Sequence, residues 1–99
     1  MKYVFSKFIK LWLGDVLKLQ TLNGFCQYGA GNKDVITEID TYDANGCYYQ
    51  CKVTDGCVAF SYITNALYID CALYRGGPYT KGNGRGLTTC YLMPIGDCC

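Results

Sequence analysis

Cysteine is the residue type in this sequence with the widest choice of chemistry, because a thiol can form a disulfide, bind a metal or act as a nucleophile. The sequence holds eight cysteines in 99 residues and no histidine. Without imidazole, Ser–His and Cys–His nucleophile pairs and zinc sites with histidine ligands are excluded. A cysteine density this high is typical of a disulfide scaffold. We therefore expect an extracellular protein, or one in an oxidising lumen such as that of the secretory pathway or a thylakoid.

Metal binding is the alternative for the cysteines in the middle of the chain. Four thiolates could bind zinc, those of Cys47, Cys51, Cys57 and Cys71, although their x3 and x5 spacings fit paired zinc knuckles poorly. Residues 43–46 begin like a calcium loop, but the glycine stands at the fourth position rather than the sixth, and Thr54 replaces the glutamate of the twelfth. No phosphate-binding glycine motif and no catalytic constellation is found. We expect no enzymatic activity, no cofactor and no metal.

A glycine-rich segment over residues 76–86 is the candidate ligand loop. Its five glycines leave the backbone free to approach a ligand. Four side chains in it offer stacking and hydrogen-bonding groups, namely Tyr79, Lys81, Asn83 and Arg85. The alternative is a flexible surface connection, because segments of this composition are usually rich in turns.

Short elements must position these groups. Asp43 can cap a helix that runs to about Val53 and carries Cys47 and Cys51 on one face. Apolar and alternating segments predict strands near residues 34–40, 57–63, 68–74 and 88–93. One helix among four or five short strands indicates an α+β fold.

The first 25 residues differ from the rest of the chain. They contain no cysteine and have a side-chain charge of +3, whereas residues 26–99 have a charge of −2. Polar residues interrupt every apolar run, which excludes a signal-peptide core and a transmembrane span. The apolar residues instead follow a helical period over roughly residues 3–19, on a stripe that includes Phe5, Phe8, Ile9, Trp12, Leu13 and Val16. Such an amphipathic helix could pack on the domain's own sheet, or dock through residues 1–22 onto a membrane surface or a larger complex.

The order and spacing of the cysteines form a specific pattern. It reads Cys47-x3-Cys51-x5-Cys57-x2-Phe60, then Cys71-x-Leu73, with Cys26 before it and Cys90 after it. This pattern resembles that of the PAN/apple domain family over residues 26 to about 93. The resemblance implies a small disulfide-rich domain in which one helix packs on a short-stranded antiparallel sheet. It also implies three disulfides, Cys26–Cys90, Cys47–Cys71 and Cys51–Cys57.

Two cysteines remain once those pairs are assigned. Cys98 and Cys99 are adjacent, and neighbouring cysteines bridge each other only with strain. They are therefore candidates for a bond to another chain. We divide the sequence into an amphipathic arm (1–25), a PAN/apple-like domain (26–94) and a cysteine-containing tail (95–99).

Two functions follow as expectations. The family resemblance implies an interaction module that binds a protein or a carbohydrate. The alternative is a structural subunit of a larger assembly, such as a fibril, a surface coat or the luminal face of a thylakoid complex, docked through its amphipathic arm. The formal net charge of +1 gives no reason to expect nucleic acid as a partner.

Overall fold

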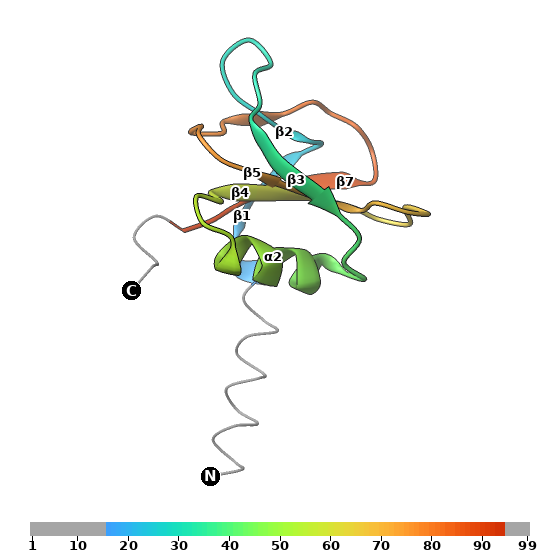
Figure 1. The fold of residues 1–99 in the computed structure, drawn as a ribbon. Helices are drawn as coiled ribbons and strands as arrows, with labels where there is room; N and C mark the ends of the chain where they lie inside the picture. The colour runs from blue at the N-terminus through green and yellow to red at the C-terminus, as the bar shows by residue number, and fades with distance from the viewer. Residues whose placement is uncertain (1–15, 95–99) are drawn as a thin grey trace.

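A five-stranded antiparallel sheet with the strand order β1-β7-β4-β5-β3 lies at the centre of the molecule (Figure 1). It is seen in a computed structural model that describes residues 16–94. A second sheet consists of the short strands β2 and β6. The strands are β1 (Gln20–Asn23), β2 (Cys26–Gln27), β3 (Val35–Ile39), β4 (Ala59–Ile63), β5 (Cys71–Tyr74), β6 (Lys81–Gly82) and β7 (Thr88–Leu92). The helices are a 3-10 turn, η1 (Val16–Lys18), and α2 (Ala44–Val53).

Helix α2 begins where the sequence supplies a cap. Asp43 Oδ1 accepts a hydrogen bond from Gly46 N at 2.8 Å, which satisfies one of the free N–H groups of the first turn. At the other end, Thr54 N donates to the carbonyl of Cys51 at 3.2 Å. The predicted capping residue and the predicted helix end are both confirmed.

One face of the sheet packs against α2. Phe60 lies at the centre of this layer, with its ring stacked on that of Tyr91 at a centroid distance of 4.9 Å. The Tyr48 ring of the helix lies 5.9 Å from the Phe60 ring. The buried members of this core are Val16, Cys47, Tyr48, Cys51, Phe60, Cys71 and Leu73.

The ribbon of β2 and β6, with its flanking loops, covers the opposite face. Figure 1 shows α2 below the sheet and β2 above it, so the molecule has three layers. Strand β4 alternates accordingly, because Phe60 faces the helix while Ala59 belongs to the second core. That core consists of Cys26, Ala59, Ala72, Tyr74, Tyr79 and Cys90. A sheet buried on both faces explains why its central strands carry few charges.

The structure confirms an α+β fold with one helix on an antiparallel sheet. Strands β3, β4, β5 and β7 lie inside the four predicted segments. The unpredicted strand β1 pairs with β7 from Gln20↔Leu92 to Asn23↔Thr89, so part of the first 25 residues belongs to the folded domain. Charge and cysteine content, which led us to divide the sequence after residue 25, do not report this strand pairing.

Only the end of the predicted amphipathic helix falls among the described residues. There η1 ends at Lys18 and β1 starts at Gln20, and residues 3–15 lie outside the described part. Within residues 16–94, none of the helices has the length and hydropathy needed to cross a membrane.

Candidate functional site

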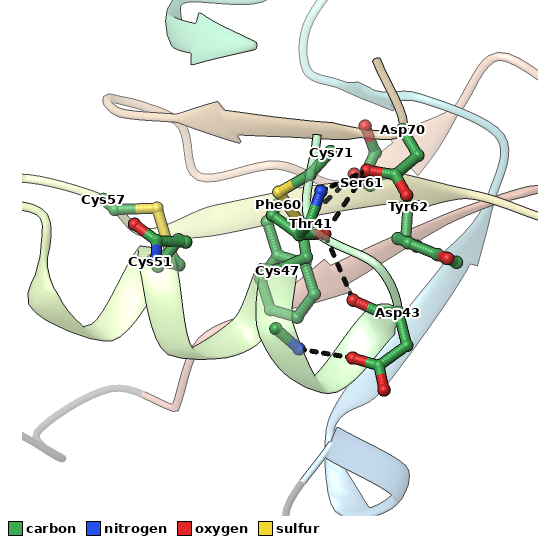
Figure 2. Close-up of a disulfide and its surroundings, with 12 residues drawn as sticks. Thr41, Asp43, Cys47, Cys51, Cys57, Phe60, Ser61, Tyr62, Asp70 and Cys71 are labelled. Atoms are coloured by element: carbon green, nitrogen blue, oxygen red, sulfur yellow. Dashed lines mark hydrogen bonds between the residues drawn. A yellow bond between two sulfur atoms is a disulfide. The ribbon is translucent and has the colours of Figure 1, made fainter. Parts of the chain in front are cut away.

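Six cysteines form three disulfides, two of which join layers of the fold. Cys26–Cys90 links the ribbon to β7. Figure 2 shows the other two, Cys47–Cys71, which links α2 to β5, and Cys51–Cys57, which closes the turn after the helix. These are the pairs that the family resemblance implies. Cys98 and Cys99 lie outside the described residues.

The disulfides show which of the two roles considered for these cysteines, cross-linking or zinc binding, the structure supports. The four cysteines considered for zinc are all oxidised in pairs, so they cannot supply thiolates, and the zinc alternative is wrong. Among residues 16–94, no three histidine, cysteine, aspartate or glutamate side chains gather as metal ligands. The bonds also place the protein in an oxidising, non-cytosolic environment.

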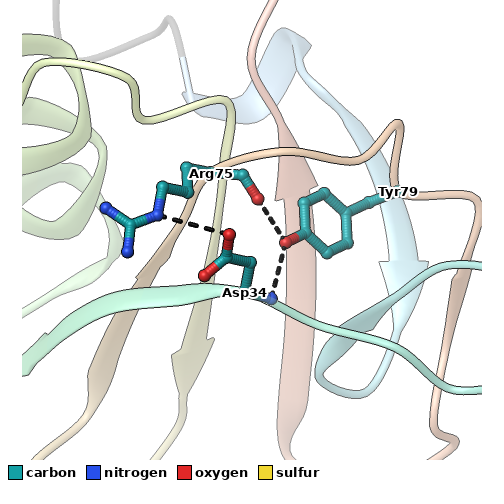
Figure 3. A network of polar contacts seen from close by, with 3 residues as sticks. All are labelled: Asp34, Arg75 and Tyr79. Carbon is teal, nitrogen blue, oxygen red and sulfur yellow. Dashed lines mark hydrogen bonds and ion pairs between the residues drawn. The ribbon is translucent and has the colours of Figure 1, made fainter.

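Tyr79 of the predicted ligand loop is a structural residue. Its side chain is only 5% exposed and packs near the rings of Tyr28 and Tyr74. Its hydroxyl accepts a hydrogen bond from Asp34 N at 3.0 Å and donates one to Arg75 O at 2.6 Å (Figure 3). Burial raises the pKa of the Tyr79 phenol above its ordinary value. The Tyr79 hydroxyl is therefore used within the fold, and little of the residue is left exposed for a ligand.

Asn83 also shapes the backbone of the glycine-rich segment. Its Oδ1 accepts hydrogen bonds from Phe25 N at 3.0 Å and from Arg85 N at 3.1 Å. Gly24 comes so close to this side chain that a Cβ atom on it would overlap Asn83. Lys81 opens β6, and both Lys81 and Arg85 are exposed. The segment thus contributes strand β6 to the ribbon. Of its four predicted ligand residues, Tyr79 and Asn83 hold loop backbone in place through their side chains, and Lys81 and Arg85 remain as exposed candidates.

Of the six predicted docking residues, the structure describes Val16, and it also describes Leu17, which continues the apolar stripe and is 84% exposed. Val16 is 4% exposed and belongs to the core beneath α2, so its side chain is not available to a partner. The other five stripe residues, Phe5, Phe8, Ile9, Trp12 and Leu13, lie outside the described residues.

A group of exposed apolar side chains at one end of the sheet was not predicted. It combines large side chains from three segments, and we call it the loop-end surface: Tyr42, Leu67, Tyr68, Ile69 and Leu87. Tyr42 is 94% exposed and Leu67 is 88% exposed. Figure 1 shows the three contributing segments on the right, where the β4–β5 loop projects beyond the sheet. The sequence predicts a strand from residue 68, which would have placed Tyr68 in the sheet, whereas β5 begins only at Cys71.

Hydrogen bonds tie the three segments together beneath this surface. Buried Asp70 accepts bonds at Oδ1 from Thr41 N at 2.8 Å and from Thr41 Oγ1 at 3.3 Å. The Tyr62 hydroxyl donates to the carbonyl of Tyr42 at 3.1 Å (Thr41, Asp70 and Tyr62 are shown in Figure 2). On the other side, Thr64 N donates to Leu87 O at 2.7 Å. The apolar side chains are therefore presented by a fixed backbone.

Backbone strain concentrates at the same end of the sheet. Among residues 16–94, the non-glycine residues with positive φ are Tyr42 (75°), Asn65 (66°) and Leu87 (66°). A left-handed conformation costs a residue other than glycine roughly 1–3 kcal/mol, and asparagine tolerates it best. Tyr42 and Leu87 accept this cost while exposing apolar side chains to water. Neither feature helps folding, so both favour a functional role for this surface.

Carboxylates surround the Tyr42 side of the surface. Burial raises the pKa of the neighbouring Tyr62 phenol, and the negative charges of Asp70, Asp43 and Asp40 raise it further. Asp40 and Asp43 are exposed. The apolar side chains of the loop-end surface are therefore accompanied by negative charge on the Tyr42 side.

A concave region lies at the opposite end of the sheet. It is a cavity of about 340 Å³ lined by Val58, Leu92 and Met93 and by the backbone turn at Gly76 and Gly77. Tyr79 supplies the one polar side chain of this lining, and its hydroxyl is already bonded to Asp34 N and Arg75 O, so few polar groups remain to orient a ligand. We therefore place the candidate site at the loop-end surface.

Comparison with known proteins adds no relative: neither a protein-family model, nor a curated protein, nor a solved structure matches this chain.

Proposed function

We propose that this protein is a non-enzymatic, PAN/apple-like interaction module that works outside the cell or in an oxidising lumen. Its binding site is the loop-end surface. The observation that carries the proposal is the exposure of five large apolar side chains on a hydrogen-bonded backbone.

The energetics of this surface favour binding. Complete burial of one large apolar side chain contributes about 1.5–3 kcal/mol, and tyrosine is among the residue types that dominate binding energy in protein interfaces. Disulfides and hydrogen bonds already fix the segments. The loss of conformational entropy when a partner binds them is therefore small.

A protein suits this surface better than a carbohydrate does. The rings of Tyr42 and Tyr68 could stack on a sugar, but Leu67, Ile69 and Leu87 offer no hydrogen bonds to its hydroxyl groups. Aliphatic side chains beside aromatic rings are typical of the centre of a protein interface.

Two leucine substitutions test the proposal. Leu67→Gln removes an apolar side chain from the loop-end surface, and Leu17→Gln makes the same change at an 84% exposed leucine on η1, outside that surface. We would immobilise the oxidised full chain, present it with a glycan array and with the extracellular or luminal proteins of its own cells, and identify bound species by cross-linking.

The proposal expects wild-type protein and Leu17→Gln to bind the same partner and Leu67→Gln to lose it. Loss in Leu17→Gln alone would contradict the proposal and favour docking through the N-terminal arm. Equal binding by all three proteins would also contradict it.

A further inference from the structure

We infer that the loop-end surface recognises a cationic, apolar peptide segment of a protein partner, with Arg or Lys side chains next to Leu-like ones. This inference rests on the proposed function and specifies the chemistry of the partner. The feature that carries it is the position in the chain of Tyr42, which is 94% exposed, between the exposed Asp40 and Asp43.

The charges at this end of the sheet are mainly negative. Exposed acids stand at the end of β3 and just after it, at Glu38, Asp40 and Asp43. Buried Asp70 adds a fourth carboxylate, which is occupied by Thr41. The base nearest to the surface in sequence is Arg85, two residues before Leu87 on the opposite flank. The local field around Tyr42 therefore attracts cations.

The two exposed carboxylates still have acceptor capacity. The Asp40 carboxylate makes no hydrogen bond or ion pair with any residue of the described range. Asp43 uses Oδ1 to cap α2, and within the same range no bond is made to its Oδ2. A guanidinium group can donate paired N–H bonds to carboxylate oxygens, and such charge-assisted bonds are stronger than neutral ones.

The exposed ring of Tyr42 adds a second attraction for the same group. Arginine and lysine bind the faces of aromatic rings, with arginine the more frequent partner. The Tyr42 backbone is fixed by the hydrogen bond from Tyr62, and the two exposed carboxylates flank Tyr42 in sequence. One cationic side chain could thus contact a ring and a carboxylate together, while neighbouring Leu-like side chains cover Leu67, Tyr68 and Ile69.

Other occupants fit the charges less well. A symmetric pair of copies would bring the same carboxylates toward one another across the interface. Anionic lipid headgroups, sulfated glycans and nucleic acids would meet the same negative field. A cationic peptide is the occupant whose charge complements the flank and whose apolar side chains match the centre.

Synthetic peptides of defined composition test this inference on the oxidised full chain. We would measure fluorescence anisotropy with three short labelled peptides that alternate Arg with Leu, Arg with Ser, or Glu with Leu. The Arg-Leu peptide should bind at least about tenfold more tightly than the other two, because only it supplies both the charge and the apolar surface. Its binding should weaken as the salt concentration rises, since exposed charges are screened.

The charge variant is Asp40→Asn combined with Asp43→Asn. Asparagine caps a helix about as well as aspartate, so this variant keeps α2 and removes only the negative charges. We expect it to bind the Arg-Leu peptide at least about tenfold more weakly than wild-type protein. Leu67→Gln should also lose binding, whereas Leu17→Gln should not.

The outcomes separate this inference from the proposed function. Equal affinity for the Arg-Leu and Glu-Leu peptides, no binding of the Arg-Leu peptide, or unchanged affinity in the charge variant would overturn the cationic partner. The proposed function as an interaction module would still be supported if Leu67→Gln abolished binding of the partner identified by cross-linking. Concentration-dependent dimers in sedimentation that Leu67→Gln abolishes would identify a second copy as the occupant, which also overturns the inference.

Discussion

Tyr42, Tyr74 and Tyr79 differ in the surroundings of their side chains, and this difference separates those that stabilise the fold from the one available for binding. The Tyr74 hydroxyl is buried and lies 3.0 Å from Ser61 Oγ, and the Tyr79 hydroxyl bridges two loop backbones. Tyr42, in contrast, exposes almost its whole ring. A buried hydroxyl must find a partner or cost free energy, whereas an exposed ring is stabilised only when something covers it. The first group therefore contributes to folding and the second is available for binding.

Tyr79→Phe should destabilise the fold without creating a cavity. The ring stays in place, but the Asp34 N–H and the Arg75 carbonyl lose their hydrogen-bond partner. We expect the free energy of unfolding to fall by about 1–3 kcal/mol in urea denaturation. Tyr28→Phe is the matched control, because the Tyr28 hydroxyl makes no hydrogen bond within the described residues, and it should cost much less. Equal losses in the two variants would show that the Tyr79 bridge contributes nothing.

Alkaline pH should destabilise the protein through its buried phenols. Burial raises the pKa values of Tyr74, Tyr79 and Tyr91 above the ordinary value of about 10. A raised pKa means that the folded state holds the proton more tightly than the unfolded state does. The corresponding stability is complete below pH of about 10 and is lost as the pH rises through the folded-state pKa values.

Melting temperature measured against pH, together with phenolate absorbance, checks this effect. We expect the melting temperature to fall above pH of about 10, and to fall less steeply in Tyr74→Phe, which removes one of the titrating groups. A flat profile in that range would contradict the linkage between these phenols and folding.

Elements with a local signal could be predicted from the sequence, and those that depend on distant partners could not. Asp43 marks the start of α2 because a cap acts within three residues. Strands β2 and β6 have two residues each, and their pairing joins Cys26 to Gly82 across the chain. Such strands exist only because the tertiary structure brings them together, so no periodic pattern announces them.

The candidate site escaped prediction for a related reason. Leu67, Tyr68 and Ile69 form an apolar run that reads equally well as part of a strand. Their exposure depends on where β5 begins, and the surface depends on Tyr42 and Leu87 lying at the same end of the sheet. Conversely, the glycine-rich segment looked like a binding loop, although Tyr79 and Asn83 point their polar groups at backbone partners.

The cap of α2 gives a prediction at the scale of one element. Asp43→Ala removes the bond to Gly46 N and should lower the free energy of unfolding by about 0.5–2 kcal/mol. Asp43→Asn keeps an oxygen acceptor at the same position and should change the free energy of unfolding by only about a few tenths of a kcal/mol. Urea denaturation of both variants measures the difference. Equal losses would mean that the charge of Asp43 matters to the helix and its hydrogen bond does not.

At the scale of the whole molecule, each disulfide joins a different pair of layers or segments. Cys26–Cys90 holds the ribbon on the sheet across 64 residues, and Cys47–Cys71 holds α2 on the sheet across 24. Cys51–Cys57 spans only 6 residues within one connection. A small domain has a net stability of only about 5–15 kcal/mol, so these bonds carry a large share of it.

Paired cysteine-to-alanine variants should therefore lose stability in the order of loop length. Restricting the unfolded chain contributes about 4 kcal/mol for the longest loop, about 3.5 for the middle one and about 2 for the shortest. We expect Cys51→Ala with Cys57→Ala to keep a cooperative melt at a lower temperature, and Cys26→Ala with Cys90→Ala to be unfolded or nearly so at 37 °C, as small domains often are without a native disulfide. Urea denaturation without reductant gives the three values. If the variant lacking Cys51–Cys57 lost the most, local packing at the end of α2 would determine the stability, and loop closure would not.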